Sequence, residues 1–149
     1  MYKRILVPVD GSDFAGKAIA EAASLGKILG SKLVLFYVSP HIHLSPLSEG
    51  FSAAGRPEEI KVAVKEMESE ADKMLASAAT NVNLAGVTVE RQFTVSNSPY
   101  AAIIEAAKQF ECELIIMGSH GRSGVSAVLL GSVTNKVLTH SSIPVLVVR

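Results

Sequence analysis

Five short runs of β-branched and apolar residues alternate with helical patterns along this chain, and that alternation limits its fold more than any other feature. The runs occupy residues 3–9, 31–38, 88–95, 113–118 and 143–148. Four of them are almost continuously apolar, as expected for strands buried on both faces of a parallel sheet. The run 88–95 instead alternates apolar and polar residues, which predicts a more exposed strand.

Helical periodicity fills the gaps between these runs. Ser12 is a candidate N-cap for an amphipathic helix over 13–29. A second helix is expected to begin at Pro57, where two glutamates follow in the first turn, and to continue to Ala78. The sequence predicts two further helices, one opened by Ser98-Pro99 and one starting near Ser132.

The resulting order is β-α-β-α-β-α-β-α-β, which implies right-handed crossovers and helices on both faces of the sheet. We therefore predict one α/β domain over 1–149 with a doubly wound, five-stranded parallel sheet. Ligands of such sheets bind beyond the carboxyl ends of the strands, where the winding reverses. The loops 10–13, 39–56 and 118–131 are thus the places to look for a site.

Composition excludes several classes of partner. The chain of 149 residues has 14 basic and 14 acidic residues, so its net charge is zero, and it has no basic run that would bind nucleic acid or an acidic membrane. It also has no secretion signal and no stretch near the roughly 18 apolar residues of a membrane span. The single Cys112 has no partner for an internal disulfide. We expect a soluble protein in the reducing cytoplasm.

The segment GSDFAGKA at 11–18 resembles a phosphate-binding P-loop that lacks its final hydroxyl residue. A P-loop needs that hydroxyl for Mg²⁺, and here the position is Ala18. Asp10 and Asp13 would also place carboxylates where phosphate oxygens lie. Because the helical periodicity runs through this segment, we interpret it as a strand–turn–helix junction capped by Ser12.

A stronger phosphate-binding pattern follows the fourth predicted strand. Gly118 and Gly121 are separated by two residues, and nine residues later Gly131-Ser132 opens a helix. Glycines allow close approach of the backbone to a ligand or a turn with positive φ. The free N–H groups and dipole at the start of a helix favour an anion. The pattern indicates a nucleotide whose phosphates lie on this loop, with Arg122 as an added cation.

These residues resemble the G-x2-G-x9-G-[ST] motif of the ATP-binding branch of the universal stress protein family. The opening VPVDGS and the closing PVLVV match this family as well, so the resemblance extends over the chain except for the variable loop 39–56. It implies the adenine nucleotide alpha hydrolase-like fold with strand order 3-2-1-4-5. In that order the first and fourth strands are neighbours, which brings Asp10 close to Gly118.

The resemblance also implies a set of ligand contacts. The residues expected around the adenine are Pro8, Val9, Asp10 and Val38, those at the ribose are Met117 and Gly118, and those at the phosphates are Gly121, Arg122, Gly131, Ser132 and Val133. Asp10 would accept hydrogen bonds from the base or ribose, or help to hold a divalent ion; the alternative is a purely structural turn. His120 faces either a phosphate or solvent.

We expect a module that binds ATP or ADP, with or without Mg²⁺ or another divalent ion, and signals stress to a downstream protein. The sequence shows no paired catalytic base and nucleophile. Two alternatives remain open: a slow ATPase, with Asp10 and His120 as the candidates to position water, and a protein-interaction dimer without nucleotide. The resemblance implies a two-fold homodimer through the last strand, 143–148, whose uncovered apolar edge would otherwise be a pairing hazard.

Three weaker features complete the sequence. His41 and His43 have a spacing that suits a metal, but no third ligand is near them in the sequence. The loop 39–56 is long enough to act as a lid. Cys112 precedes a buried strand without a basic residue beside it, so we expect an unreactive thiol.

Overall fold

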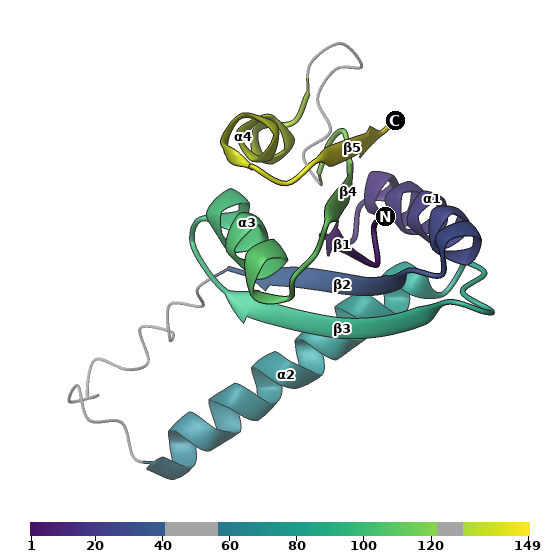
Figure 1. Ribbon diagram of the computed structural model, residues 1–149. Coiled ribbons are helices and arrows are strands. Elements are labelled where there is room, and N and C mark those ends of the chain that lie inside the picture. The colour runs from purple at the N-terminus through teal and green to yellow at the C-terminus, as the bar shows by residue number, and fades with distance from the viewer. Residues whose placement is uncertain (41–56, 122–129) are drawn as a thin grey trace.

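The strands form one parallel sheet in the predicted order. The protein is described by a computed structural model over residues 1–40, 57–121 and 130–149. Its strands are β1 (Arg4–Val9), β2 (Lys32–Ser39), β3 (Thr88–Val95), β4 (Leu114–Gly118) and β5 (Val145–Val148). The sheet order is β3-β2-β1-β4-β5 with every pairing parallel, which confirms the doubly wound fold (Figure 1).

Helices cover both faces of this sheet. They are α1 (Asp13–Leu29), α2 (Pro57–Ala79), α3 (Pro99–Gln109) and α4 (Ser132–His140). One apolar cluster joins α1 and α2 to the sheet, and a second joins α3 and α4 to the opposite face. The first half of α2 extends beyond the sheet (Figure 1), and its core packing begins near Ala71. No helix in the described ranges is long and apolar enough to cross a membrane.

The boundaries of the last strand differ from the prediction for a local reason. The expected strand began at Ile143, but β5 begins at Val145. The Ile143 N–H donates instead to the Ser141 hydroxyl at 3.0 Å, and Pro144 has no N–H to contribute to a ladder. The Pro144 carbonyl still accepts from Ile115 at 3.0 Å, so β4 and β5 pair from the following residue onward.

Charged residues gather at the amino end of the sheet. Glu90 of β3 pairs with Arg4 of β1 at 3.0 Å and with Lys32 of β2. The hydrogen bond from Lys32 lowers the pKa of the Glu90 carboxyl, partly opposed by desolvation. Arg4 also lies near Cys112, contrary to the expectation that no basic group is close. Burial outweighs this charge and raises the pKa of the Cys112 thiol, which fits an unreactive cysteine.

The start of α1 and the end of β4 are in unusually close contact. A Cβ atom at Gly118 would lie 2.7 Å from the Phe14 Cβ and 2.9 Å from its carbonyl carbon. Only glycine allows the first turn of α1 to approach β4 this closely. The carbonyl of Gly118 in turn accepts a hydrogen bond from the buried Thr134 hydroxyl of α4 at 2.9 Å. Elements on both faces of the sheet are therefore anchored at one residue.

We predict that Gly118→Ala destabilises the protein by about 1–3 kcal/mol, because the added methyl group would push α1 away from β4. Gly16→Ala is the matched control, since Gly16 lies in α1 with no atom within 4 Å of its added Cβ. The control should be more stable than the wild type by roughly 0.5–1 kcal/mol, as expected for alanine inside a helix. Urea unfolding measures both effects; equal stabilities of the two variants would contradict the proposed contact.

Candidate functional site

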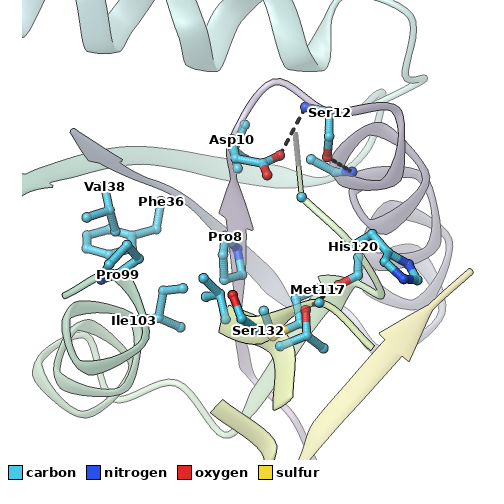
Figure 2. Close-up of a pocket in the computed structure, with 17 residues that line it drawn as sticks. Pro8, Asp10, Ser12, Phe36, Val38, Pro99, Ile103, Met117, His120 and Ser132 are labelled. Carbon is cyan, nitrogen blue, oxygen red and sulfur yellow. Dashed lines mark hydrogen bonds between the residues drawn. The ribbon is translucent and has the colours of Figure 1, made fainter. Parts of the chain in front are cut away.

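A cavity of about 320 Å³ opens at the carboxyl end of the sheet, on the face covered by α3 and α4. Its volume lies at the lower end of the range typical of small-ligand sites. The residues that line it are Pro8, Val9, Asp10, Ser12, Ala15, Phe36, Val38, Pro99, Ile103, Met117, Gly118, His120, Gly121, Gly131, Ser132, Val133 and Thr134 (Figure 2). All the site residues predicted from the sequence are among them except Arg122, which lies outside the described residues.

The sheet order explains why these residues meet. β1 is the central strand and pairs with both β2 and β4. The connection after β1 leads to α1 on one face of the sheet, and the connection after β4 leads to α4 on the other face. Residues after β1, at the end of β2 and after β4 therefore converge at one switch point. The sequence predicted that Asp10 and Gly118 share this crevice, and both line the cavity. Asp10 is in closest contact with Gly121, where its Oδ2 lies 2.6 Å from the position of an added Cβ.

The segment 11–18 forms a turn and the start of α1, as predicted. The Asp10 Oδ1 accepts a hydrogen bond from the Ser12 N–H at 3.0 Å, and the Ser12 hydroxyl caps α1 by accepting from Ala15 at 3.2 Å. Lys17 is exposed, and its Nζ lies 5.3 Å from the centre of the Phe14 ring. The lysine is part of a helical surface rather than a phosphate-binding loop.

Each glycine of the motif has a specific neighbour inside the protein. Gly118 contacts Phe14, Gly121 faces the Asp10 carboxylate, and a Cβ at Gly131 would lie 3.2 Å from both the Ser119 carbonyl oxygen and the His120 Cα. None of the three has positive φ. The sequence interpretation, which assigned these glycines to the ligand or to left-handed turns, missed that the protein's own packing already requires them.

Hydrogen bonds join the two ends of the glycine-rich segment. The Gly131 N–H donates to the Ser119 carbonyl at 2.8 Å, and the Ser119 N–H donates to the Val148 carbonyl of β5 at 2.8 Å. Gly131 is the N-cap of α4 and provides no side-chain cap, so the first-turn N–H groups of α4 are oriented toward the cavity end of the helix. The positive end of the α4 dipole therefore lies at the side of the cavity that Gly131 and Ser132 line.

The cavity is apolar at its other end. Phe36, Val38 and Ile103 come from β2 and α3, and Pro8, Pro99 and Met117 complete that wall (Figure 2). Sequence reasoning missed Phe36 and Pro99 as lining residues. Phe36 is two residues before Val38 in the same strand, so strand periodicity could have placed both on one face. Pro99 was expected only as a helix start, and its place in the cavity depends on how α3 packs against β2.

The His120 side chain does not point into the cavity. Its ring centre lies 5.3 Å from that of Phe14, and Figure 2 shows the imidazole directed toward α1. The His120 Nδ1 is 3.1 Å from the Ser119 hydroxyl, while Nε2 is buried and has no hydrogen-bond partner in the described part of the chain. Its Nε2 is therefore not exposed to solvent, one of the two alternatives that the sequence left open, and contact with a phosphate stays a prediction.

No preformed metal site is found in the ranges that the structure describes, since they contain no group of three or more His, Cys, Asp or Glu side chains able to share an ion. His41 and His43 lie outside those ranges, as does most of the loop 39–56. Of the residues that the structure describes, Asp10 is the acidic one that lines the cavity. A divalent ion here would have to share its coordination between this carboxylate and a bound ligand.

An all-parallel α/β sheet with a cavity at its switch point defines a class of small ligand-binding domains. The sequence model of the universal stress protein family matches residues 1–149, and the chain belongs to this family. It is similar to the universal stress protein Sll1388 of Synechocystis, with 32% identity over 152 residues, covering 99% of this chain and 98% of the relative.

Solved structures show the same fold. The structure of MJ0577 superimposes with a TM-score of 0.76 at 29% identity and covers 99% of this chain and 96% of that one; MJ0577 is a universal stress protein of Methanocaldococcus jannaschii. A universal stress protein from Archaeoglobus fulgidus, solved in complex with dAMP, has a TM-score of 0.59 at 22% identity, with 99% and 98% coverage. Some solved proteins of this fold therefore bind nucleotides.

Proposed function

We propose that this universal stress protein binds ATP in the cavity and acts as a nucleotide-dependent stress-response module. The observation that supports the proposal is that the two ends of the cavity differ in polarity. One end is apolar, and the other is formed by Gly121, Gly131 and the amino end of α4. A nucleotide has the same division, with a flat base at one end and negatively charged phosphates at the other.

The apolar end suits the base and the ribose. Phe36 and Ile103 are 3% exposed, and Met117 is 5% exposed, so these side chains are packed against the core and form an ordered apolar wall. Apolar walls with a few polar groups are typical of cofactor sites. Val38, at the end of β2, would flank the base, and Pro8, Val9 and Asp10 would enclose it from β1, as the family resemblance implies.

The polar end suits the phosphates. Backbone N–H groups at the start of a helix bind anions through both hydrogen bonding and the helix dipole. Ser132 and Val133 are in the first turn of α4, and Ser132 is exposed, so its hydroxyl can also donate. Arg122 would add a positive charge. Asp10 would either accept from a ribose hydroxyl or hold a divalent ion that accompanies the phosphates.

The dAMP complex of the Archaeoglobus fulgidus protein and a further universal stress protein solved with cAMP support an adenine nucleotide as the ligand. The His120 ring faces α1 in this structure, and a slow ATPase in which Asp10 and His120 position water stays an untested alternative. A cytoplasmic location and a downstream protein partner stay predictions.

Ser132→Asp tests the phosphate end. A carboxylate at the first turn of a helix stabilises that helix, so the variant should fold at least as well as the wild type. The same carboxylate repels phosphates, and we expect ATP affinity to fall by roughly 100-fold. Ser132→Asn is the matched control because asparagine has nearly the same shape without the charge. Calorimetric titration with ATP measures the difference.

Adenosine provides the second control for this experiment. Since it has no phosphates, its affinity should be similar in the two variants. Equal ATP affinities of Ser132→Asp and Ser132→Asn would contradict phosphate binding at α4. If the wild type bound neither ATP nor adenosine, the alternative of a protein-interaction dimer without nucleotide would replace the proposal.

We also propose that two copies associate through β5. This strand has β4 on one side only, and it is at the edge of the described sheet. Leu146 of β5 is 39% exposed and Leu138 of the adjoining α4 is 37% exposed. An apolar edge strand with unpaired backbone groups favours pairing with another strand. Two-fold pairing of β5 with its own copy would cover both the edge and these leucines.

Leu146→Lys should convert a dimer into monomers of 15.7 kDa, because it places a charge at the centre of the proposed interface. Ile28→Lys is the control, because it introduces the same charge at a residue of α1 that is 80% exposed and far from β5 in the sequence. Sedimentation velocity reports the mass of each protein. A wild type that sediments as a monomer, or a Leu146→Lys variant that remains dimeric, would contradict this interface.

A further inference from the structure

His120 carries a buried nitrogen whose hydrogen-bonding capacity is not used. Its Nε2 is inaccessible to solvent and has no hydrogen-bond partner among the residues that the structure describes, although nearly all buried polar atoms in proteins are hydrogen-bonded. Burying such a group without a partner costs free energy. His120 lies between Gly118-Ser119 and Gly121 in the sequence, in the loop that forms the polar end of the cavity. A nitrogen of this kind is suited to a hydrogen-bond partner that is present only when a ligand is bound.

The backbone of His120 is close to where phosphates would bind. Gly131, the N-cap of α4, packs against the His120 Cα, and Gly121 follows directly. Moving the imidazole from Phe14 to the cavity would require rotation about its Cα–Cβ bond. In its present position the ring makes a tilted contact with Phe14 and a hydrogen bond between its Nδ1 and the Ser119 hydroxyl.

The chemistry of the ring suits a phosphate. When the Ser119 hydroxyl donates to Nδ1, the proton of the neutral imidazole is on Nε2, which is then a donor. Phosphate oxygens accept such a proton in a charge-assisted hydrogen bond, which is about twice as strong as a neutral one. The exchange of the Ser119 pair and the Phe14 contact for a phosphate bond is therefore favourable when a phosphate is within reach.

We propose that His120 senses the length of the phosphate chain: its ring leaves Phe14 and donates from Nε2 to the outermost phosphate of ATP. This proposal rests on the proposed function, since it requires an adenine nucleotide in the cavity. In this proposal the N–H groups of α4 would hold the phosphate next to the ribose, and the His120 Nε2 would add a hydrogen bond where the phosphate chain continues. The residue thus gives the site a preference for ATP over AMP.

His120→Phe tests this role. Phenylalanine keeps a ring against Phe14 and removes both nitrogens. Because it also removes the Nδ1 partner of the buried Ser119 hydroxyl, thermal unfolding is used to check that the variant is folded. We expect its ATP affinity to fall about tenfold and its AMP affinity to stay within about twofold, as for loss of one hydrogen bond to a charged group. Calorimetric titrations with ATP, ADP and AMP measure the change, and His120→Gln, which keeps a donor, should recover part of the ATP affinity.

His140→Phe is the matched control, because His140 is exposed on α4 and does not line the cavity. It should alter none of the three affinities. Parallel loss of ATP and AMP affinity in His120→Phe would overturn the proposal and leave His120 a structural residue, and unchanged affinities would overturn it too. These results differ from failure of the proposed function, in which the wild type itself binds none of the nucleotides.

A spectroscopic measurement on the wild type keeps the proposal testable if His120→Phe does not fold. The ring proton and carbon signals of His120 should shift on addition of ATP, because the imidazole leaves the ring current of Phe14. AMP should leave those signals nearly in place. Identical shifts with the two nucleotides would overturn the proposal.

Discussion

The contact between Gly118 and the first turn of α1 is the constraint on which the rest of the structure depends. It joins the end of β4 to α1 on one face of the sheet, and the Thr134 hydroxyl joins the same residue to α4 on the other. Ser119, the next residue, is bonded to both Val148 and Gly131. The central strands, the last strand and the start of α4 thus meet at one tightly packed junction.

This junction determines the chemistry of the cavity. It fixes the amino end of α4 beside Gly121 and brings the Asp10 carboxylate to the same place, while β2 and α3 provide an apolar wall a short distance away. The ion pairs of Glu90 lie at the opposite, amino end of the strands, where they add no charge to the site. At this end of the cavity the N–H groups at the start of α4 are held by the helix itself and are suited to anions.

Much of this arrangement follows from sequence patterns. Apolar runs and helix caps located the strands and helices to within two residues at most boundaries, because buried parallel strands and capped helices have strong local patterns. The site residues after β1 and β4 could be predicted because the sheet order makes these strands neighbours. The contacts that require glycine could not be predicted from the sequence, since Gly118 and Gly121 face Phe14 and Asp10, more than a hundred residues away along the chain. The position of the His120 ring and the role of Pro99 likewise depend on packing between distant elements.

An amide NMR spectrum recorded with and without ATP tests the central claim most directly. If the nucleotide lies with its phosphates on the glycine-rich loop and α4, the largest shifts occur at Gly121, Gly131 and Val133, and Lys17 is nearly unchanged. The account would be contradicted by a spectrum that ATP does not alter, or by one in which the shifts centre on Gly16 and Lys17.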